Sequence, residues 1–201
     1  MPLGSQGRNN SVREIRKQPN DAMHKSRLVG VIDLGHQPPF EARGKMVESS
    51  YKYEFIYELL NLPDDYYEEG RPFWQSEEVK DKWYKSDKAG LSDSKLTSRV
   101  EVLEAYENVD SNEGQNFEVL IGQACAVKTK VDAKGYAKII DVTELLPGTE
   151  VPELMNPPLV FDWSDPDKET WDRLSPLTKK KIQQALDYDE KLKDWVDSLE
   201  E

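Results

Sequence analysis

The stretch SKLTSRVEVLEAYE, residues 94–107, decides the fold, because it is a helical pattern set between two groups of strand patterns. Ser92-Asp93-Ser94 supplies helix-starting residues. The apolar side chains that recur at helical spacing are Leu96, Val100, Leu103 and Tyr106. Residues 26–85 contain three strand-like runs, and residues 117–145 contain two more. Three strands, a helix and two strands is the order of a five-stranded OB barrel, a fold that often binds single-stranded nucleic acid or oligosaccharide. We therefore expect a mainly β protein, an OB-fold barrel with a helix between strands 3 and 4.

Alternation and turn residues set the strand boundaries. We predict strands over 27–35, 45–60, 71–85 with a kink, 117–131 and 136–142. The first strand is apolar on both faces near its middle, where a glycine indicates a bulge or bend.

The second strand carries four rings at period two, on one face: Tyr51, Tyr53, Phe55 and Tyr57. They form either an exposed stacking platform or the filling of the barrel. We favour the filling, because OB strands bury one face and this face is the more apolar. The opposite face is predicted to be solvated and consists of Lys52, Glu54, Ile56 and Glu58.

Composition and charge limit the function classes. Of 201 residues, 37% are hydrophobic and 33% charged, so we expect one modest core and much solvated sequence. The net charge is −12, yet residues 1–27 carry six basic and two acidic groups, whereas residues 150–201 carry seven and fourteen. The negative total charge argues against strong nonspecific binding of duplex DNA. It does not argue against binding of single strands, where ring stacking supplies much of the free energy. We expect no membrane-spanning run and no secretion leader.

The single cysteine and the two histidines give little sign of chemistry. Cys125 lies in an alternating apolar segment, so we expect a buried small hydrophobe rather than a nucleophile. One thiol cannot form an internal disulfide, which fits a reducing cytoplasm. His24 and His36 lie in loop-like surroundings without metal-ligand spacing, so we expect no histidine-based zinc site and no cofactor.

Aromatic and basic side chains interleave over 71–85, and a single-strand groove needs such rings for bases and cations for phosphates. A partly buried edge strand with snorkelling lysines fits the same pattern, and this alternative stays open. The hairpin of strands four and five lies where this fold commonly borders the oligonucleotide groove, although a solvated tip is the other interpretation. The candidate nucleic-acid-binding residues are Arg71, Phe73, Trp74, Lys80, Lys82, Trp83, Tyr84, Lys128, Lys130, Lys134, Tyr136 and Lys138.

Composition also divides the chain into four parts. We expect a tag scar, MPLGS, and a disordered basic arm in residues 1–25, and an OB-fold nucleic-acid-binding domain over residues 26–146. We expect residues 147–174 to form an extended proline-rich segment that lies on the barrel or on a second copy of it. Residues 175–201 form an amphipathic, acidic helical extension that starts at Ser175-Pro176. Anions at its C-terminus oppose the helix dipole, so this end frays or serves a basic partner.

Several runs are similar to those of a group of bacteriophage single-stranded DNA-binding proteins. They are RLVGVIDLG at 27–35, RPFW at 71–74, the apolar residues of 117–127, VPELMNPPLVFD at 151–162 and the Asp-Pro-Asp of 165–167.

The resemblance, over roughly residues 26–186, implies an OB-fold protein that coats and protects single-stranded DNA in phage replication or recombination. It implies binding without sequence specificity, no enzymatic activity, no membrane partner and a place in the cytoplasm of the infected bacterial host. Such proteins often carry an acidic C-terminus that recruits replication or recombination proteins and competes with DNA. By position and charge, the corresponding residues are Asp187, Asp189, Glu190, Asp194, Trp195, Asp197, Glu200 and Glu201. The sequence also leaves open whether the protein forms a homodimer.

Two other functions compete with single-strand binding. Pro63-Asp64 followed by Glu78-Val79-Lys80 fits the loose pattern of metal-dependent nucleases, in which carboxylates hold a divalent ion. Chance matches to this pattern are expected in so charged a chain, and the strand order does not support it. An OB-fold protein-interaction or virion-associated module without DNA binding is the main alternative, because OB barrels also bind proteins and sugars.

Overall fold

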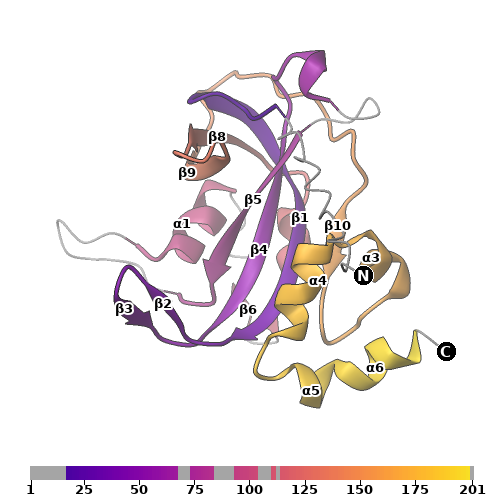
Figure 1. The fold of residues 1–201 in the computed structure, drawn as a ribbon. Helices are drawn as coiled ribbons and strands as arrows, with labels where there is room; N and C mark the ends of the chain where they lie inside the picture. The colour runs from indigo at the N-terminus through magenta and orange to yellow at the C-terminus, as the bar shows by residue number, and fades with distance from the viewer. Residues whose placement is uncertain (1–16, 68–72, 84–92, 104–109, 112–113, 200–201) are drawn as a thin grey trace, which may run out of the picture.

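The structure is a computed structural model, and it describes residues 17–67, 73–83, 93–103, 110–111 and 114–199. Its main element is a six-stranded sheet in the order β5-β4-β1-β8-β9, with antiparallel neighbours and a short β10 that pairs in parallel with β1 (Figure 1). The predicted mainly β fold is confirmed. No helix within the described residues is long and apolar enough to cross a membrane.

The elements follow one another as three long strands, a helix and two strands, and then a helical C-terminal part. The strands are β1 (Met23–Gln37), β2 (Phe40–Ala42), β3 (Lys45–Val47), β4 (Ser50–Leu59), β5 (Phe73–Lys80), β6 (Asp110–Ser111), β7 (Gly114–Gln115), β8 (Ala124–Val131), β9 (Ala137–Thr143) and β10 (Leu159–Phe161). The α-helices are α1 (Lys95–Val102), α3 (Lys168–Arg173), α4 (Pro176–Gln183), α5 (Tyr188–Lys191) and α6 (Lys193–Ser198). Two 3-10 helices are η1 (Asp64–Tyr66) and η2 (Phe117–Leu120).

The two outer strands of the sheet, β5 and β9, approach each other without pairing in the described part of the chain. Gln75 Nε2 on β5 donates to the carbonyl of Ala137 on β9 across 3.1 Å. Arg99 on α1 spans the same gap, because it donates to the carbonyl of Val142 on β9 and pairs with Glu77 on β5 at 2.7 Å. The sheet is therefore strongly curled but not closed by a hydrogen-bonded ladder, so the closed barrel remains a prediction.

Strand β1 is buried on both faces, as its sequence predicted, because it contributes to two cores. Leu28 and Val31 belong to the core inside the curl, whereas Val29 and Ile32 belong to a second core on the other face. The register with β4 shifts at Gly30, which confirms the predicted bulge. A Cβ at Gly30 would lie 2.7 Å from the carbonyl oxygen of Leu159, so only glycine lets β10 pair so closely.

Three of the four rings of β4 follow the favoured prediction. Phe55 and Tyr57 are fully buried inside the curl, and Tyr53 packs against the same core. The prediction of a solvated opposite face is wrong, because Glu54 and Glu58 are only 6% and 0% exposed. The C-terminal part of the chain covers this face.

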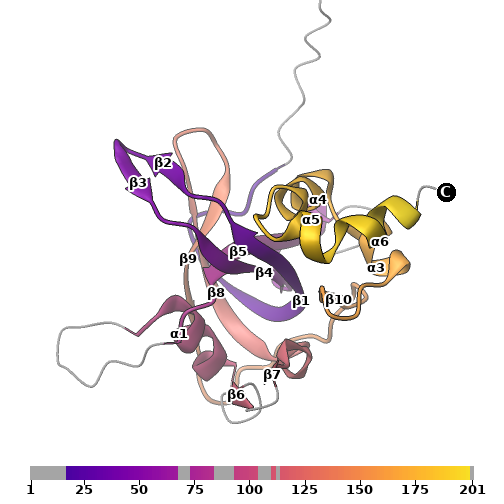
Figure 2. The ribbon, with the colours of Figure 1, turned by 90° about the horizontal axis from the view of Figure 1, so that it is seen from below.

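Residues 150–199, which we call the C-terminal segment, pack against the sheet of their own chain. Figure 2 shows α3 to α6 on the side of the sheet opposite α1. The predicted single helix over 175–201 is wrong, since the structure has the three short helices α4, α5 and α6 there. Its predicted start is correct: Pro176 opens α4, and the Ser175 side chain accepts a hydrogen bond from the backbone N–H of Thr178. The apolar face that was predicted for an extension instead builds the second core, through Ile182, Leu192 and Val196.

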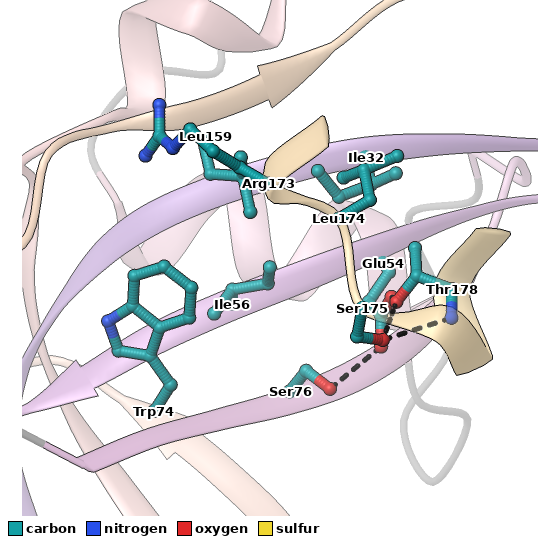
Figure 3. Close-up of a pocket in the computed structure, with 10 residues that line it drawn as sticks. All are labelled: Ile32, Glu54, Ile56, Trp74, Ser76, Leu159, Arg173, Leu174, Ser175 and Thr178. Carbon is teal, nitrogen blue, oxygen red and sulfur yellow. Dashed lines mark hydrogen bonds between the residues drawn. The ribbon is translucent and has the colours of Figure 1, made fainter. Parts of the chain in front are cut away.

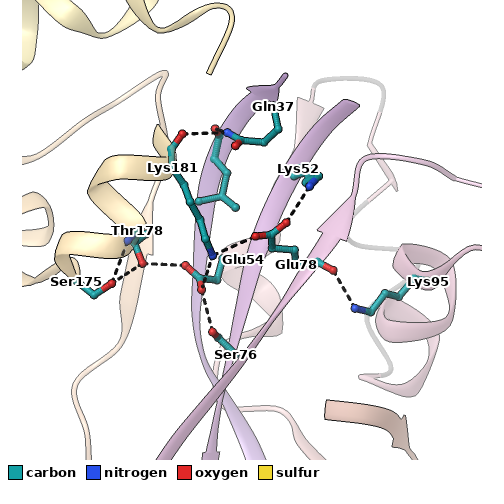
Figure 4. A network of polar contacts seen from close by, with 10 residues as sticks. Gln37, Lys52, Glu54, Ser76, Glu78, Lys95, Ser175, Thr178 and Lys181 are labelled. Atoms are coloured by element: carbon teal, nitrogen blue, oxygen red, sulfur yellow. Dashed lines mark hydrogen bonds and ion pairs between the residues drawn. The ribbon is translucent and has the colours of Figure 1, made fainter. Parts of the chain in front are cut away.

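Buried carboxylates on β4 anchor the C-terminal segment. Glu58 accepts hydrogen bonds from the backbone N–H of Met155 (2.7 Å), and from the backbone N–H (3.0 Å) and side-chain amide (2.6 Å) of Asn156. Glu54 accepts from the hydroxyl of Thr178 (3.0 Å) and lies 3.5 Å from Lys181 Nζ on α4 (Figure 4). Each anion thus gains donors that offset the cost of burying it.

Other predicted boundaries also change. The strand predicted over 45–60 is interrupted, because residues 40–47 form the separate β2–β3 hairpin with positive φ at Arg43 and Gly44. The start of the strand predicted over 117–131 is η2 and a turn. The predicted capping of the central helix is confirmed, since the Ser94 side chain accepts from the backbone N–H of Thr97. The last residues predicted for that helix lie outside the described residues.

Candidate nucleic-acid interface

The groove predicted over 71–85 does not come together as an exposed row of rings. Phe73 is 5% exposed and belongs to the core inside the curl, whereas Trp74 points to the other face of β5 and packs against the second core. Trp83 is half-buried against the first core. Lys80 and Lys82 are exposed, and Arg71 and Tyr84 lie outside the described residues. In this region the interpretation as a partly buried strand is therefore the better one.

The hairpin of β8 and β9 does present the predicted lysines together. Cys125, Val127 and Thr129 point into the core, so Lys128 and Lys130 alternate with them and are exposed. Lys130 on β8 is directly opposite Lys138 on β9, which is also exposed. Like charges in directly opposite positions destabilise a sheet, and an anion beside the pair relieves this repulsion; Asp132 already lies beside Lys138.

The turn of this hairpin is ordered by one carboxylate. Asp132 Oδ1 accepts from the backbone N–H groups of Lys134 (2.9 Å) and Tyr136 (3.1 Å), and its other oxygen lies 2.9 Å from Lys138 Nζ. The hydrogen bond from Lys138 is the main cause that lowers the pKa of Asp132 to about 2. The Tyr136 ring is 47% exposed beside this turn, so one ring and a group of lysines share the hairpin.

Sequence reasoning missed the β2–β3 hairpin. Both views show it standing clear of the main sheet (Figures 1 and 2). Phe40 is 47% and Met46 69% exposed, and Arg43 and Lys45 are exposed at the tip. Pro38 and Pro39 precede it and remove backbone donors, but the Arg43-Gly44 pair between short alternating runs was an available hairpin signal.

The predicted partner-binding residues of the acidic end are partly structural. Asp187 accepts from the backbone N–H of His36 (2.9 Å) and pairs with Lys191 (3.0 Å), so it fixes α5 to the end of β1. Trp195 is half-buried, with its ring centroid 6.0 Å from that of Trp171 in the second core. The exposed members are Asp189, Glu190, Asp194 and Asp197, and the pair Glu200 and Glu201 lies outside the described residues.

The two carboxylates of the predicted nuclease pattern do not share a site. Glu78 pairs with Lys52 (2.8 Å) and Lys181 (3.1 Å), and in the sheet it is opposite Glu54. Asp64 follows the other end of β4, where Leu59 is opposite Phe73. Five strand positions separate the two ends, about 16 Å. Within the described ranges, no group of three or more His, Cys, Asp or Glu side chains is arranged to hold a metal ion.

Cys125 is a buried small hydrophobe, as predicted. It is 0% exposed, and burial raises the pKa of its thiol to about 12. The placement of His24 and His36 in loops is wrong, because both are residues of β1, and His24 is buried there. Its Nε2 is 2.9 Å from the Thr129 hydroxyl, and burial lowers its pKa.

Asp33 on β1 is a buried carboxyl group whose pKa is raised toward neutral pH. Burial raises the pKa of its carboxyl from 3.8 to about 6, although hydrogen bonds from the Gly35 N–H (2.8 Å) and the Tyr51 hydroxyl (2.7 Å) oppose that rise. The folded protein therefore binds this proton more tightly than the unfolded chain does. The carboxyl lowers stability above pH 6, and this cost disappears as the pH falls to about 4.

We expect Asp33→Asn to raise the free energy of unfolding by about 3 kcal/mol near pH 7 and to leave it unchanged near pH 4. Urea denaturation of both proteins across this pH range measures the difference. Asp165→Asn, at an exposed aspartate, is the control and should change little at either pH. An equal effect of Asp33→Asn at both pH values would contradict the argument.

Comparisons with protein-family models, with curated proteins and with solved structures find no match to this chain.

Proposed function

We propose that this protein binds single-stranded DNA without sequence specificity, through the outer face of the β8–β9 hairpin and the neighbouring tip of its turn. The observation that carries the proposal is the directly opposed pair Lys130 and Lys138, with Lys128 and Lys134 nearby, on a chain of net charge −12. Asp132, which pairs with Lys138 at 2.9 Å, and Asp141, which is opposite Lys128, balance only two of these four lysines, so a local excess of positive charge remains. This excess fits a polyanion, and the exposed ring of Tyr136 offers a stacking surface for a base.

The fold supports the same proposal. With β1, β4, β5, β8 and β9 numbered 1 to 5, the strand order is 3-2-1-4-5 with a helix between 3 and 4, and we infer an OB-type barrel. In that fold the loops between strands 1 and 2 and between strands 4 and 5 contact oligonucleotides. Here these are the β2–β3 hairpin, which carries Phe40 and Arg43, and the turn that carries Lys134 and Tyr136.

The resemblance of the sequence to phage single-stranded DNA-binding proteins supports a role in coating strands during phage replication or recombination. We include the exposed acidic residues of α5 and α6 in the proposal as a surface for replication or recombination proteins. They are Asp189, Glu190, Asp194 and Asp197.

Lys130→Gln with Lys138→Gln is the test of this interface. Each lysine–phosphate contact on a single strand contributes about −0.7 to the slope of log affinity against log salt, so the double variant should flatten the slope by about 1.4. At low salt we expect an affinity loss of about tenfold. Fluorescence anisotropy of a labelled poly-dT oligonucleotide across a salt series measures both quantities. Tryptophan quenching is less suitable, because Trp163 and Trp171 are buried.

Lys180→Gln with Lys193→Gln is the matched control, since it removes the same charge from exposed positions on α4 and α6. It should leave affinity and slope close to those of the unaltered protein. Equal losses in both double variants, or no binding by the unaltered protein at low salt, would refute the interface.

The covered sheet favours a second candidate function, that of a protein-interaction module. In an OB fold the face of strands 2 and 3 binds oligonucleotides, and here the C-terminal segment lies on the corresponding face of β4 and β5. Crosslinking of DNA to Lys138 separates the two candidates, because only the first requires DNA at that side chain.

A further inference from the structure

The C-terminal segment does not fill all the space above β4 and β5. A cavity of about 200 Å³ remains there (Figure 3). Ile32 and Ile56 line it from the sheet, and Leu159 and Leu174 line it from the segment. A cavity of about 150 Å³ with such walls can hold benzene, so this one has room for a single six-membered ring with small substituents.

One end of this cavity is polar and centres on a buried carboxylate. Glu54, 6% exposed, accepts from the hydroxyls of Ser76 (2.8 Å) and Thr178 (3.0 Å), and Lys181 Nζ lies 3.5 Å away (Figure 4). A carboxylate offers about four acceptor positions. Glu54 can therefore accept one more hydrogen bond from a donor inside the cavity.

The other end carries a flat ring and a guanidinium group. Figure 3 shows Trp74 and the guanidinium of Arg173 at this end, away from Glu54 and the hydroxyl groups. Arg173 is exposed and gives one of its five N–H groups to the Pro157 carbonyl at 2.9 Å. Trp74 Nε1 is buried and has no hydrogen-bond partner among the described residues.

We propose that this cavity binds the base of a cytosine nucleotide, with the phosphate at Arg173, and this inference rests on the proposed function. A ring fits between Ile56 and the leucines, and the exocyclic amino group of cytosine is the donor that a glutamate accepts. Thymine carries a carbonyl oxygen at that ring position, which a carboxylate repels. A guanidinium binds phosphate oxygens in a charge-assisted, bidentate manner. The site would give a sequence-tolerant protein a preference for cytosine at one position of the strand.

Titration of the full chain with dCMP, dTMP, dAMP and deoxycytidine tests the proposal. We expect dCMP to bind about tenfold more tightly than dTMP, since one hydrogen bond to a charged group distinguishes them. The methyl NMR signals of Ile56, Leu159 and Leu174 should shift with dCMP. Equal affinity for dCMP and dTMP, tighter binding of dAMP, or unshifted methyl signals would overturn the proposal.

Two substitutions separate the base contact from the phosphate contact. Arg173→Gln should remove the advantage of dCMP over deoxycytidine and keep the preference for cytosine over thymine, whereas Lys180→Gln, an exposed control on α4, should change neither. Glu54→Gln should abolish the preference for cytosine. Because Glu54 also anchors Thr178, the NMR titration of the unaltered chain provides a test that does not depend on the folding of this variant.

The failure of this inference is distinguishable from the failure of the proposed function. Oligonucleotide binding that depends on Lys130 and Lys138 without any dCMP effect would refute the cytosine site alone. Specific dCMP binding without any oligonucleotide affinity would refute the proposed coating function alone.

Discussion

Gly35→Ala is expected to lower the free energy of unfolding by about 4 kcal/mol, as measured by urea denaturation. Gly35 has φ +69°, a conformation that costs a residue with a Cβ about 1–2 kcal/mol. A Cβ there would also lie 2.2 Å from the ring of Trp163 and 2.9 Å from Asp187 Oδ1. Neither neighbour can move freely. Trp163 Nε1 donates to the Asp33 carbonyl at 2.9 Å, and Asp187 accepts from the His36 N–H at 2.9 Å. Overpacking of this kind adds about 1–3 kcal/mol.

Gly44→Ala is a matched control for this experiment. Gly44 has φ +73°, close to that of Gly35, but a Cβ there meets nothing within 4 Å. It should therefore lose only the conformational part, about 1–2 kcal/mol. Equal losses of stability in Gly35→Ala and Gly44→Ala would contradict the close packing of Trp163 against Gly35 of β1.

The sequence predicted the features of the fold that depend on local pattern. The order of strands and helix, the two buried faces of β1 and the inward rings Phe55 and Tyr57 all follow from periodicity, which reports burial directly. The start of α4 at Ser175-Pro176 follows from capping chemistry, which is equally local.

The packing of the C-terminal segment on the outer face of β4 could not be predicted from local pattern. Glu54 and Glu58 alternate with the rings, and a local pattern identifies such carboxylates as solvated. Their donors Thr178, Met155 and Asn156 come from about 100 residues further along the chain, and no periodicity connects them. An anion with partners so distant in sequence looks like a surface residue until the fold is known.

The candidate nucleic-acid interface was likewise predicted only where local pattern determines exposure. Lys128 and Lys130 were predicted as binding residues of the fourth strand, and both are exposed on β8. Of the two interpretations left open for 71–85, the exposed groove does not hold at Phe73 and Trp74, because neighbouring residues of a strand point to opposite faces and each ring packs against one of the two cores. Only the second core, built by distant residues, covers Trp74 on the outer face of β5, whereas Glu78 and Lys80 on that face are exposed.

Glu58→Ala is the second substitution for which we expect a large effect, a loss of about 4 kcal/mol in the free energy of unfolding. Removal of this carboxylate, which is 0% exposed, leaves three donors of Met155 and Asn156 without their acceptor, at about 1–3 kcal/mol each before local relaxation. Urea denaturation measures the total. Glu153→Ala is the control, because that side chain is 92% exposed and its change should be within about 0.5 kcal/mol.

Hydrogen exchange then shows how far the effect of Glu58→Ala extends. Strand β10 pairs with β1, and Val29, Ile32 and Leu34 of β1 belong to the same core as α4 and α6. The C-terminal segment and the sheet should therefore unfold as one cooperative unit, and the amides of β1 should lose protection together with those of residues 154–163. Faster exchange confined to residues 154–163 would mean that the segment opens separately from the sheet. In that case the face of β4 and β5 becomes accessible without global unfolding, and the cover no longer counts against DNA binding on that face.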